Sequence, residues 1–223
     1  MQGQRAELDW RPGDVPVSVR FDDPYFSLDD GLAEARYVFL DGNRLPERFD
    51  PGFQVAELGF GTGLNFLATW AAWDGAGVPG SLRFTSFEAF PMSRDEMERA
   101  HKAFPELQRW SDILLSAWSE EGGRFDLGTA VLHVITADAR TALPNWDETA
   151  DAWFLDGFSP AKNPELWEED LLINVGRHTK PGGTVATYTA AGFVRRGLEA
   201  AGFAVERRAG FGRKRHMTIG QLA

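Results

Sequence analysis

The chain has 223 residues, of which 43% are hydrophobic, a size and composition that fit one large domain with a substantial apolar core. It contains no cysteine, which excludes disulfides, thiolate nucleophiles and zinc–sulfur sites, and its four scattered histidines predict no metal site. The formal charge of −10 at pH 7 argues against a protein that coats nucleic acid nonspecifically.

The sequence predicts a cytoplasmic protein with no membrane partner. Its N-terminus lacks the apolar segment of a signal peptide. No apolar run approaches the roughly 20 residues that a membrane-spanning helix needs.

The first predicted elements are a short strand and a helix. Residues 15–20 are expected to form an edge strand, because Pro16 lacks the N–H that a central strand would use. Ser27 and Asp30 have the spacing of a capping box, with Asp in place of Glu. They predict a helix that starts there and ends near residues 41–43.

A glycine loop follows a short apolar segment, residues 53–58, which predicts a buried strand. Gly59, Gly61 and Gly63 can adopt positive φ and let a ligand approach without meeting a Cβ. The apolar residues 64–73 predict a buried helix directly after the loop. Its N-terminus presents free N–H groups and favours a small anionic group.

Two cofactors could use such a loop. A dinucleotide fingerprint needs a third glycine where the helix packs on the strand, and that position is Leu64. Glu57, in front of the loop, would repel a pyrophosphate but not the ammonium of a methionine moiety. The sequence therefore favours S-adenosylmethionine over NAD.

The next predicted strand, 82–88, ends in Glu88, which can accept hydrogen bonds from both hydroxyls of a ribose. Helical segments are expected within 93–115. Residues 122–135 predict a hairpin whose second arm is a core strand. Asp138 follows this strand and is a candidate for binding an adenine amino group.

A further strand, 150–155, leads into Asp156 and a tight loop that contains prolines. The remaining predicted elements are a helix over 165–180, a strand over 184–189, a helix over 192–201 and a closing hairpin of 203–207 with 216–220.

Strands that alternate with helices predict an α/β fold with a mostly parallel sheet, and ligands bind at the carboxyl ends of such strands. Carboxylates end four of the predicted strands: Glu57, Glu88, Asp138 and Asp156. We expect residues 53–223 to form a Rossmann-like domain and residues 1–52 to form an N-terminal arm with a capping helix.

Asp156 is the predicted catalytic residue. Methyl transfer from a sulfonium depends mainly on holding the nucleophile in position. Asp156 could accept an N–H hydrogen bond from an amine and later its proton, while Phe158 packs against a planar ring. The alternative is that Asp156 only caps its loop.

The C-terminal end is basic on an otherwise acidic chain. Residues 191–223 hold seven Lys and Arg residues against two acids, a local charge of +5. This end could bind a polyanion or could be an ordinary solvated surface.

Five segments of the sequence carry a resemblance to a known family: 21–27, 57–67, 156–167, 191–198 and 210–215. The most specific motif among them is Asp-Gly-Phe-Ser-Pro-Ala-Lys-Asn-Pro, residues 156–164. With these segments the chain resembles, over nearly its whole length, the methyltransferase half of the MnmC family. Members of that family use S-adenosylmethionine to methylate 5-aminomethyl-2-thiouridine at the tRNA wobble position, giving 5-methylaminomethyl-2-thiouridine.

This resemblance implies a class I S-adenosylmethionine-dependent methyltransferase with an antiparallel C-terminal hairpin. It implies tRNA, bound at the anticodon stem-loop, as the partner. Bifunctional members carry an FAD-dependent oxidoreductase half that is absent from this sequence, so we expect a stand-alone methyltransferase. His216 stands where the resemblance leads us to expect an acid.

The expected site residues fall into two groups besides Asp156, with no metal ligand among them. The expected cofactor-binding residues are Glu57, Gly59, Gly61, Gly63, Asn65, Glu88, Asp138 and Ala139. The expected substrate-binding residues are Phe158, Pro160, Lys162, Arg195, Arg196, Arg213, Lys214 and Arg215.

Two other functions remain open from the sequence. An acidic protein would suit a methyltransferase or aminopropyltransferase that acts on a small amine. A cofactor-binding fold could also serve as a catalytically silent interaction module. The presence of Asp156 in its complete loop argues against silence.

Overall fold

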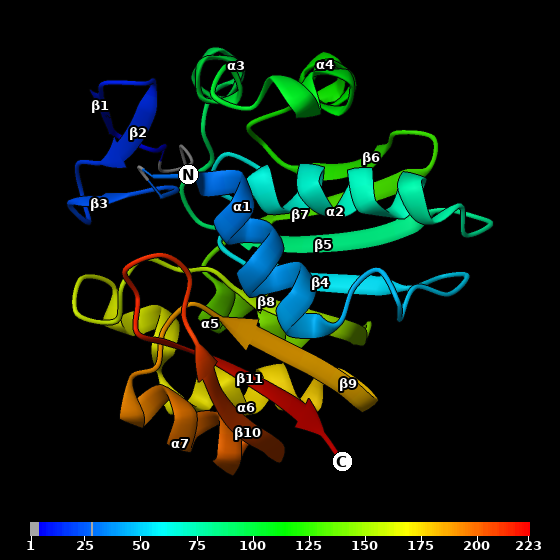
Figure 1. The fold of residues 1–223 in the computed structure, drawn as a ribbon, viewed down its shortest axis with the longest axis vertical. Helices are drawn as coiled ribbons and strands as arrows, with labels where there is room; N and C mark the ends of the chain where they lie inside the picture. The colour runs from blue at the N-terminus through cyan, green and yellow to red at the C-terminus, as the bar shows by residue number, and fades with distance from the viewer. Residues whose placement is uncertain (1–4, 28) are drawn as a thin grey trace.

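The structure is a computed structural model that describes residues 5–27 and 29–223. Its main feature is an eight-stranded sheet (Figure 1). The strands are β4 (Gln54–Leu58), β5 (Leu82–Glu88), β6 (Gly123–Asp126), β7 (Ala130–Thr136), β8 (Ala150–Leu155), β9 (Thr179–Thr187), β10 (Phe203–Ala209) and β11 (His216–Leu222).

The strand order is β10-β11-β9-β8-β4-β5-β7-β6. The five strands from β9 to β7 are parallel, whereas β6, β11 and β10 run antiparallel to their neighbours. The predicted α/β fold with an antiparallel C-terminal hairpin is therefore confirmed. The carboxyl ends of the parallel strands meet at one edge, which is where a ligand site is expected.

Helices cover both faces of the sheet (Figure 1). One face carries α2 (Leu64–Ala76) and the helix made by α1 (Gly31–Ala35) with its π-helical continuation η1 (Arg36–Leu40). The other face carries α5 (Ala139–Ala142), α6 (Glu169–Arg177) and α7 (Gly192–Ala200).

Strand β8 shows why both faces are apolar. Side chains alternate along a strand, so the neighbours Trp153 and Phe154 point to opposite faces. Phe154 packs against Phe39 on one side, with ring centroids 5.3 Å apart, and Trp153 packs against Trp146 on the other, at 5.9 Å. A strand buried in this way has no polar face, as is typical of parallel sheets.

Helix α3 (Arg94–His101) begins after Ser93, which forms both bonds of a capping box with Glu96. A 3-10 turn, η3 (Pro105–Leu107), leads into α4 (Gln108–Ala117). The buried His101 ring contacts Ser111 Oγ and the carbonyl of Thr62, each at 2.7 Å. His101 thereby ties both helices to the glycine loop.

The N-terminal arm forms a sheet of its own, with strands β1 (Leu8–Arg11), β2 (Val15–Ser18) and β3 (Asp23–Pro24). The prediction of an edge strand over residues 15–20 was wrong, because β2 lies between the other two strands. Pro16 is tolerated there because its carbonyl still accepts a hydrogen bond from Tyr25 N at 3.1 Å. Pro16 lacks only the backbone N–H donor, and this gap lies at the end of the pairing between β2 and β3.

Two predicted helix boundaries were also wrong. Asp30, and not Ser27, caps α1, since its Oδ1 accepts a hydrogen bond from Ala33 N at 2.9 Å. The helix expected over 165–180 is a 3-10 turn, η5 (Pro164–Trp167), followed by the shorter α6. Strand β9 begins earlier than predicted, since Thr179 already pairs with Ala150 of β8. The glycine-rich segment 181–183 lies at an irregularity inside β9 and does not form a turn before the strand.

Within the described residues, no helix has the length and apolar character needed to cross a membrane.

Candidate active site

A cavity of about 1290 Å³ opens at the carboxyl edge of the sheet. The loops that follow β4, β5, β7 and β8 line it, together with the arm before α1 and the loop between β10 and β11. Sites for a single small molecule usually have volumes of about 300–1,000 Å³. This cavity therefore has room for a cofactor and part of a second molecule.

The glycine loop after β4 forms the floor of the cavity. Gly59 has φ of 90°, and a Cβ placed on it would lie 2.8 Å from the carbonyl oxygen of Asp156. Only glycine allows the loop to pack so closely on the chain that leaves β8. Gly59 and Gly61 line the cavity, whereas Gly63 lies outside its lining, with φ of 78° at the start of α2.

Glu88 ends β5 and connects the cavity to this loop. Its Oε2 accepts a hydrogen bond from Gly61 N at 2.9 Å, and its Oε1 accepts one from Phe90 N at 2.7 Å. Burial raises the pKa of Glu88, and the backbone N–H groups oppose that shift. Each carboxylate oxygen has a second lone pair, so Glu88 can still accept hydrogen bonds from ligand hydroxyls.

Asp138 and Ala139 lie beside Glu88, after β7, and both line the cavity. Asp138 caps α5 by accepting a hydrogen bond from Arg140 N at 2.9 Å, and it also pairs with the Arg140 guanidinium at 2.7 Å. The hydrogen bond from the Arg140 side chain is the main cause that lowers the pKa of Asp138. Asp138 is therefore ionised and can act only as an acceptor.

Glu57 is not exposed to the cavity. It is fully buried, with Oε1 accepting a hydrogen bond from Asn65 Nδ2 at 2.9 Å and Oε2 accepting one from Ser86 Oγ at 2.8 Å. Burial raises its pKa well above the ordinary value. The structure thus places Glu57 behind Asn65 and outside the residues that line the cavity, although the sequence predicts that it binds the cofactor.

Asp156 lies at the end of β8 and lines the cavity. Its Oδ2 accepts a hydrogen bond from Asn65 Nδ2 at 2.7 Å, so this one amide nitrogen serves two carboxyl groups. Burial raises the pKa of Asp156 to about 7, while Asn65 and Lys214 lower it and Glu34 raises it. A group that titrates near neutral pH is suited to accept and release a proton.

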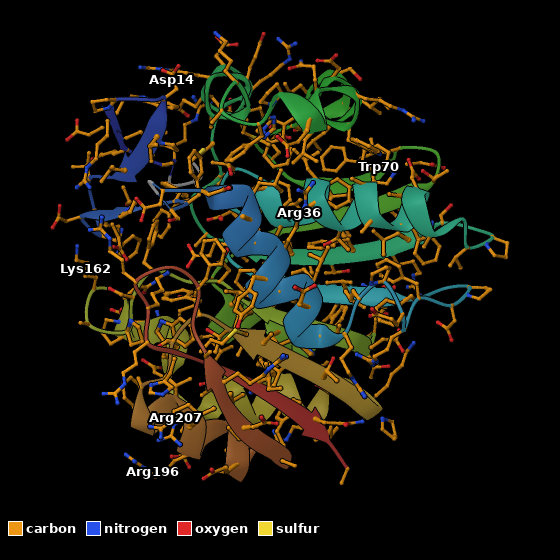
Figure 2. All side chains as sticks on the ribbon, in the orientation of Figure 1. Asp14, Arg36, Trp70, Lys162, Arg196 and Arg207 are labelled. Carbon is orange, nitrogen blue, oxygen red and sulfur yellow. The ribbon has the colours of Figure 1, made fainter. Side chains whose placement is uncertain are left out.

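The loop after Asp156 meets the N-terminal arm above the cavity. The rings of Phe158 and Phe21 stack with centroids 4.8 Å apart, and Ser159 N donates to Asp23 Oδ2 at 2.9 Å. Lys162 pairs with Asp22 and Asp23 of the arm, and Figure 2 shows it on this loop. Phe158 and Lys162 line the cavity, but Pro160 does not.

The basic residues near the C-terminus occupy two different places. Arg213 and Lys214 line the cavity from the loop between β10 and β11, whereas Arg195, Arg196 and Arg215 lie outside its lining. Figure 2 shows Arg196 and Arg207 on the outer side of the α7 and β10 region, far from Trp70 in α2. The structure therefore brings only part of the predicted substrate-binding set to the cavity.

Sequence reasoning missed two residues that line the cavity beside Asp156. Tyr188 directly follows β9, so its place at a strand end is a signal in the sequence. The prediction considered only carboxylates at strand ends and therefore did not include this tyrosine. Glu34 lies on α1, and its sequence surroundings give no sign that it faces the site.

Comparisons with known proteins agree with this geometry. A family model described as S-adenosyl-L-methionine-dependent methyltransferase matches residues 105–223. The crystal structure of MnmC2 from Aquifex aeolicus is similar with a TM-score of 0.77 and 25% identity, over 99% of this chain and 72% of that one.

Two further structures share the fold. Spermidine synthase from Thermotoga maritima has a TM-score of 0.60 and 12% identity, over 100% of this chain and 70% of its own. Precorrin-6y C5,15-methyltransferase from Geobacter metallireducens has a TM-score of 0.54 and 11% identity, over 96% of this chain and 100% of its own. At these identities the likeness concerns the fold alone.

The cavity fits S-adenosylmethionine. Gly59 and Gly61 line the cavity, and the Glu88 carboxylate faces the same space. Asp138 and Ala139 offer a carboxylate acceptor and a backbone group next to it. We expect these residues to hold the ribose and the adenine.

Replacing Glu88 with Ala should weaken S-adenosylmethionine binding by about 2–3 kcal/mol, roughly 30- to 150-fold, because it removes charge-assisted hydrogen bonds. Calorimetric titration with S-adenosylmethionine and with NAD measures the effect. Glu199→Ala, which removes an exposed acid on α7, is the control and should leave the affinity unchanged. Equal affinity of both variants, or binding of NAD alone, would contradict this assignment.

The titration of Asp156 should respond in opposite directions to its two neighbours. Asn65→Ala removes a hydrogen bond to the ionised form and should raise the pKa of Asp156 by about one unit, whereas Glu34→Gln removes a like charge and should lower it. Carbon-13 NMR titration of the aspartate carboxyl groups measures both shifts. No shift in either variant would show that burial alone controls the group, and shifts of the same sign would contradict the assigned roles of Asn65 and Glu34.

Proposed function

Because the chain belongs to the family of S-adenosyl-L-methionine-dependent methyltransferases, with S-adenosylmethionine as its cofactor, we propose that it methylates the wobble uridine of tRNA. The proposed acceptor is the primary amine of 5-aminomethyl-2-thiouridine, and the product is 5-methylaminomethyl-2-thiouridine. The carrying observation is a carboxyl group with a pKa of about 7, Asp156, at the end of the strand beside the glycine loop. A tRNA substrate would place the enzyme in the cytoplasm.

Two similarities support this acceptor. The sequence resembles the MnmC methyltransferase half in five segments, and four of them contribute residues of the cavity: the arm, the glycine loop with the start of α2, the loop after β8 and the loop before β11. The overall structure is similar to MnmC2 from Aquifex aeolicus over 99% of the chain.

Asp156 would act as the proton acceptor. When bound, S-adenosylmethionine would supply a methyl group on a positively charged sulfur, which the amine nitrogen would take while the electron pair of the C–S bond stays on sulfur. A primary amine has a pKa near that of lysine, about 10, so it arrives as an ammonium. Asp156 takes one of its protons before transfer, which frees the nitrogen lone pair, and releases it to solvent afterwards.

Asn65 positions Asp156 for this step. It lies on the first turn of α2 and donates to Oδ2, so the other oxygen of Asp156 stays free for the acceptor. Phe158 and Phe21 both line the cavity, where their stacked rings can pack against a uracil that is turned out of the anticodon loop.

Exposed arginines of the C-terminal segment would bind the phosphates of the anticodon stem-loop. Arg213 is 92% exposed, and its nearest carboxylate oxygen, on Asp29, is 3.9 Å away. Arg196 is also exposed. Both are available to phosphates, and they belong to the segment with a local charge of +5.

A small amine is the second candidate acceptor. The observation in its favour is that Asp156 and Glu34, both acids, line the same part of the cavity. Free polyamines and tRNA that carries the aminomethyl group, each incubated with labelled cofactor, distinguish the two candidates.

Asp156→Ala should reduce turnover by at least 100-fold, because the amine then has no proton acceptor. Cofactor affinity, measured by calorimetry, should stay within about twofold, because Asp156 faces the acceptor. Transfer of labelled methyl groups to undermethylated tRNA measures turnover. A loss of less than about tenfold would make Asp156 a loop cap.

Arg213→Glu should raise the Michaelis constant for tRNA and reduce the log–log slope of tRNA binding against salt by about one. The physical reason is the loss of one phosphate contact. Binding measured at several salt concentrations tests this, with Lys102→Glu, an exposed change at the end of α3, as the control. Identical salt slopes for both variants would mean that the basic C-terminal segment is an ordinary solvated surface that does not contact tRNA phosphates.

A further inference from the structure

We propose that Glu34 and Tyr188 form the binding site for the ammonium of the methyl acceptor, and that the side chain of Lys214 occupies this site until tRNA phosphates draw it away. This inference rests on the proposed function and adds a specificity device to it.

The contacts of Lys214 define a site for a cation. Its Nζ donates to Glu34 Oε1 at 2.8 Å and lies 4.2 Å from the centre of the Tyr188 ring. The Glu34 side chain is only 12% exposed, so its charge requires a cationic partner. A carboxylate beside an aromatic face is the arrangement that binds ammonium groups.

The site lies where the acceptor has to react. The Tyr188 hydroxyl donates to the carbonyl oxygen of Gly157 at 2.8 Å, which fixes the ring next to Asp156. Glu34, Tyr188 and Asp156 line one cavity, and the charges of Glu34 and Lys214 both act on the pKa of Asp156. An ammonium held by Glu34 and Tyr188 is therefore adjacent to the proposed proton acceptor.

Lys214 has the same terminal group as the proposed acceptor. Its side chain ends in CH₂–NH₃⁺, and so does a 5-aminomethyl group on uridine. Two such groups cannot occupy one carboxylate and one ring face together. The contacts that Lys214 makes in the structure are accordingly the contacts that the acceptor would make after displacing it.

Lys214 is placed so that it can leave. It belongs to the exposed loop between β10 and β11, and its side chain is 46% exposed, so the ion pair with Glu34 is partly solvated. Its neighbour Arg213, at the rim of the same cavity, is 92% exposed and is proposed to bind phosphate. A polyanion that binds Arg213 offers Lys214 a second anionic partner outside the cavity.

This arrangement selects against free amines. A tethered lysine competes at an effective concentration in the millimolar range, which a dilute small amine cannot match. A tRNA brings both the phosphates that attract Lys214 and the amine that replaces it. The enzyme would thus respond to an amine attached to a polyanion far better than to the amine alone.

The test compares Lys214→Met, which removes the charge but keeps most of the side-chain length, with Arg207→Met, a charge loss of the same size on the outer side of β10. For the nucleoside 5-aminomethyl-2-thiouridine, Lys214→Met should lower the Michaelis constant about tenfold, and it should raise that for tRNA. Arg207→Met should leave the nucleoside constant unchanged. An unchanged or higher nucleoside constant in Lys214→Met would overturn the proposal.

A binding measurement separates this proposal from the proposed function. Ethylammonium, titrated against the protein with NMR detection of the Tyr188 ring, should bind about tenfold more tightly to Lys214→Met than to the unmodified chain. It should bind weakly to Lys214→Met that also carries Glu34→Gln. If ethylammonium binds in this order but tRNA is not methylated, the result supports the ammonium site and contradicts the proposed substrate. Equal ethylammonium affinity in all three proteins would refute the site itself.

Discussion

The site depends on one amide group that holds two carboxyl groups. Asn65 Nδ2 donates to Glu57 Oε1 and to Asp156 Oδ2, which come from the adjacent parallel strands β4 and β8. Two buried carboxylates so close together cannot both be ionised at little cost. Burial raises the pKa of both groups: Glu57 lies fully buried behind Asn65, whereas Asp156 faces the cavity and has a pKa of about 7. The different surroundings of two similar groups thus give them different roles.

The glycine loop makes this arrangement possible. Asn65 reaches both carboxyl groups because α2 begins immediately after Gly63, and the close contact of Gly59 with the Asp156 carbonyl brings the two strand ends together. His101 supports the same loop from outside by contacting the carbonyl of Thr62. The loop therefore shapes the cofactor side and also sets the position of the proton acceptor on the other side.

Much of this could be predicted from sequence, because short apolar runs bounded by glycine and proline mark parallel strands well. Asp138 and Asp156 were placed at strand ends on that basis, and both line the cavity. The orientation of the Glu57 side chain could not be predicted in this way. The pattern of a strand does not show which of its last residues is covered by the helix that follows. The pairing of Glu34 with Lys214 joins residues 180 positions apart and leaves no local pattern.

The distribution of charge explains how an acidic chain can serve a polyanionic substrate. The arginines proposed for phosphate binding are exposed, so salt screens their contacts and binding there stays reversible. Glu34 is largely buried, so its attraction for an ammonium is screened far less. A tRNA with an aminomethyl group carries both charges, negative along its backbone and positive at one base. The outer surface would therefore supply affinity that depends on salt, while the cavity supplies the choice of base, and the overall negative charge limits binding elsewhere on the molecule.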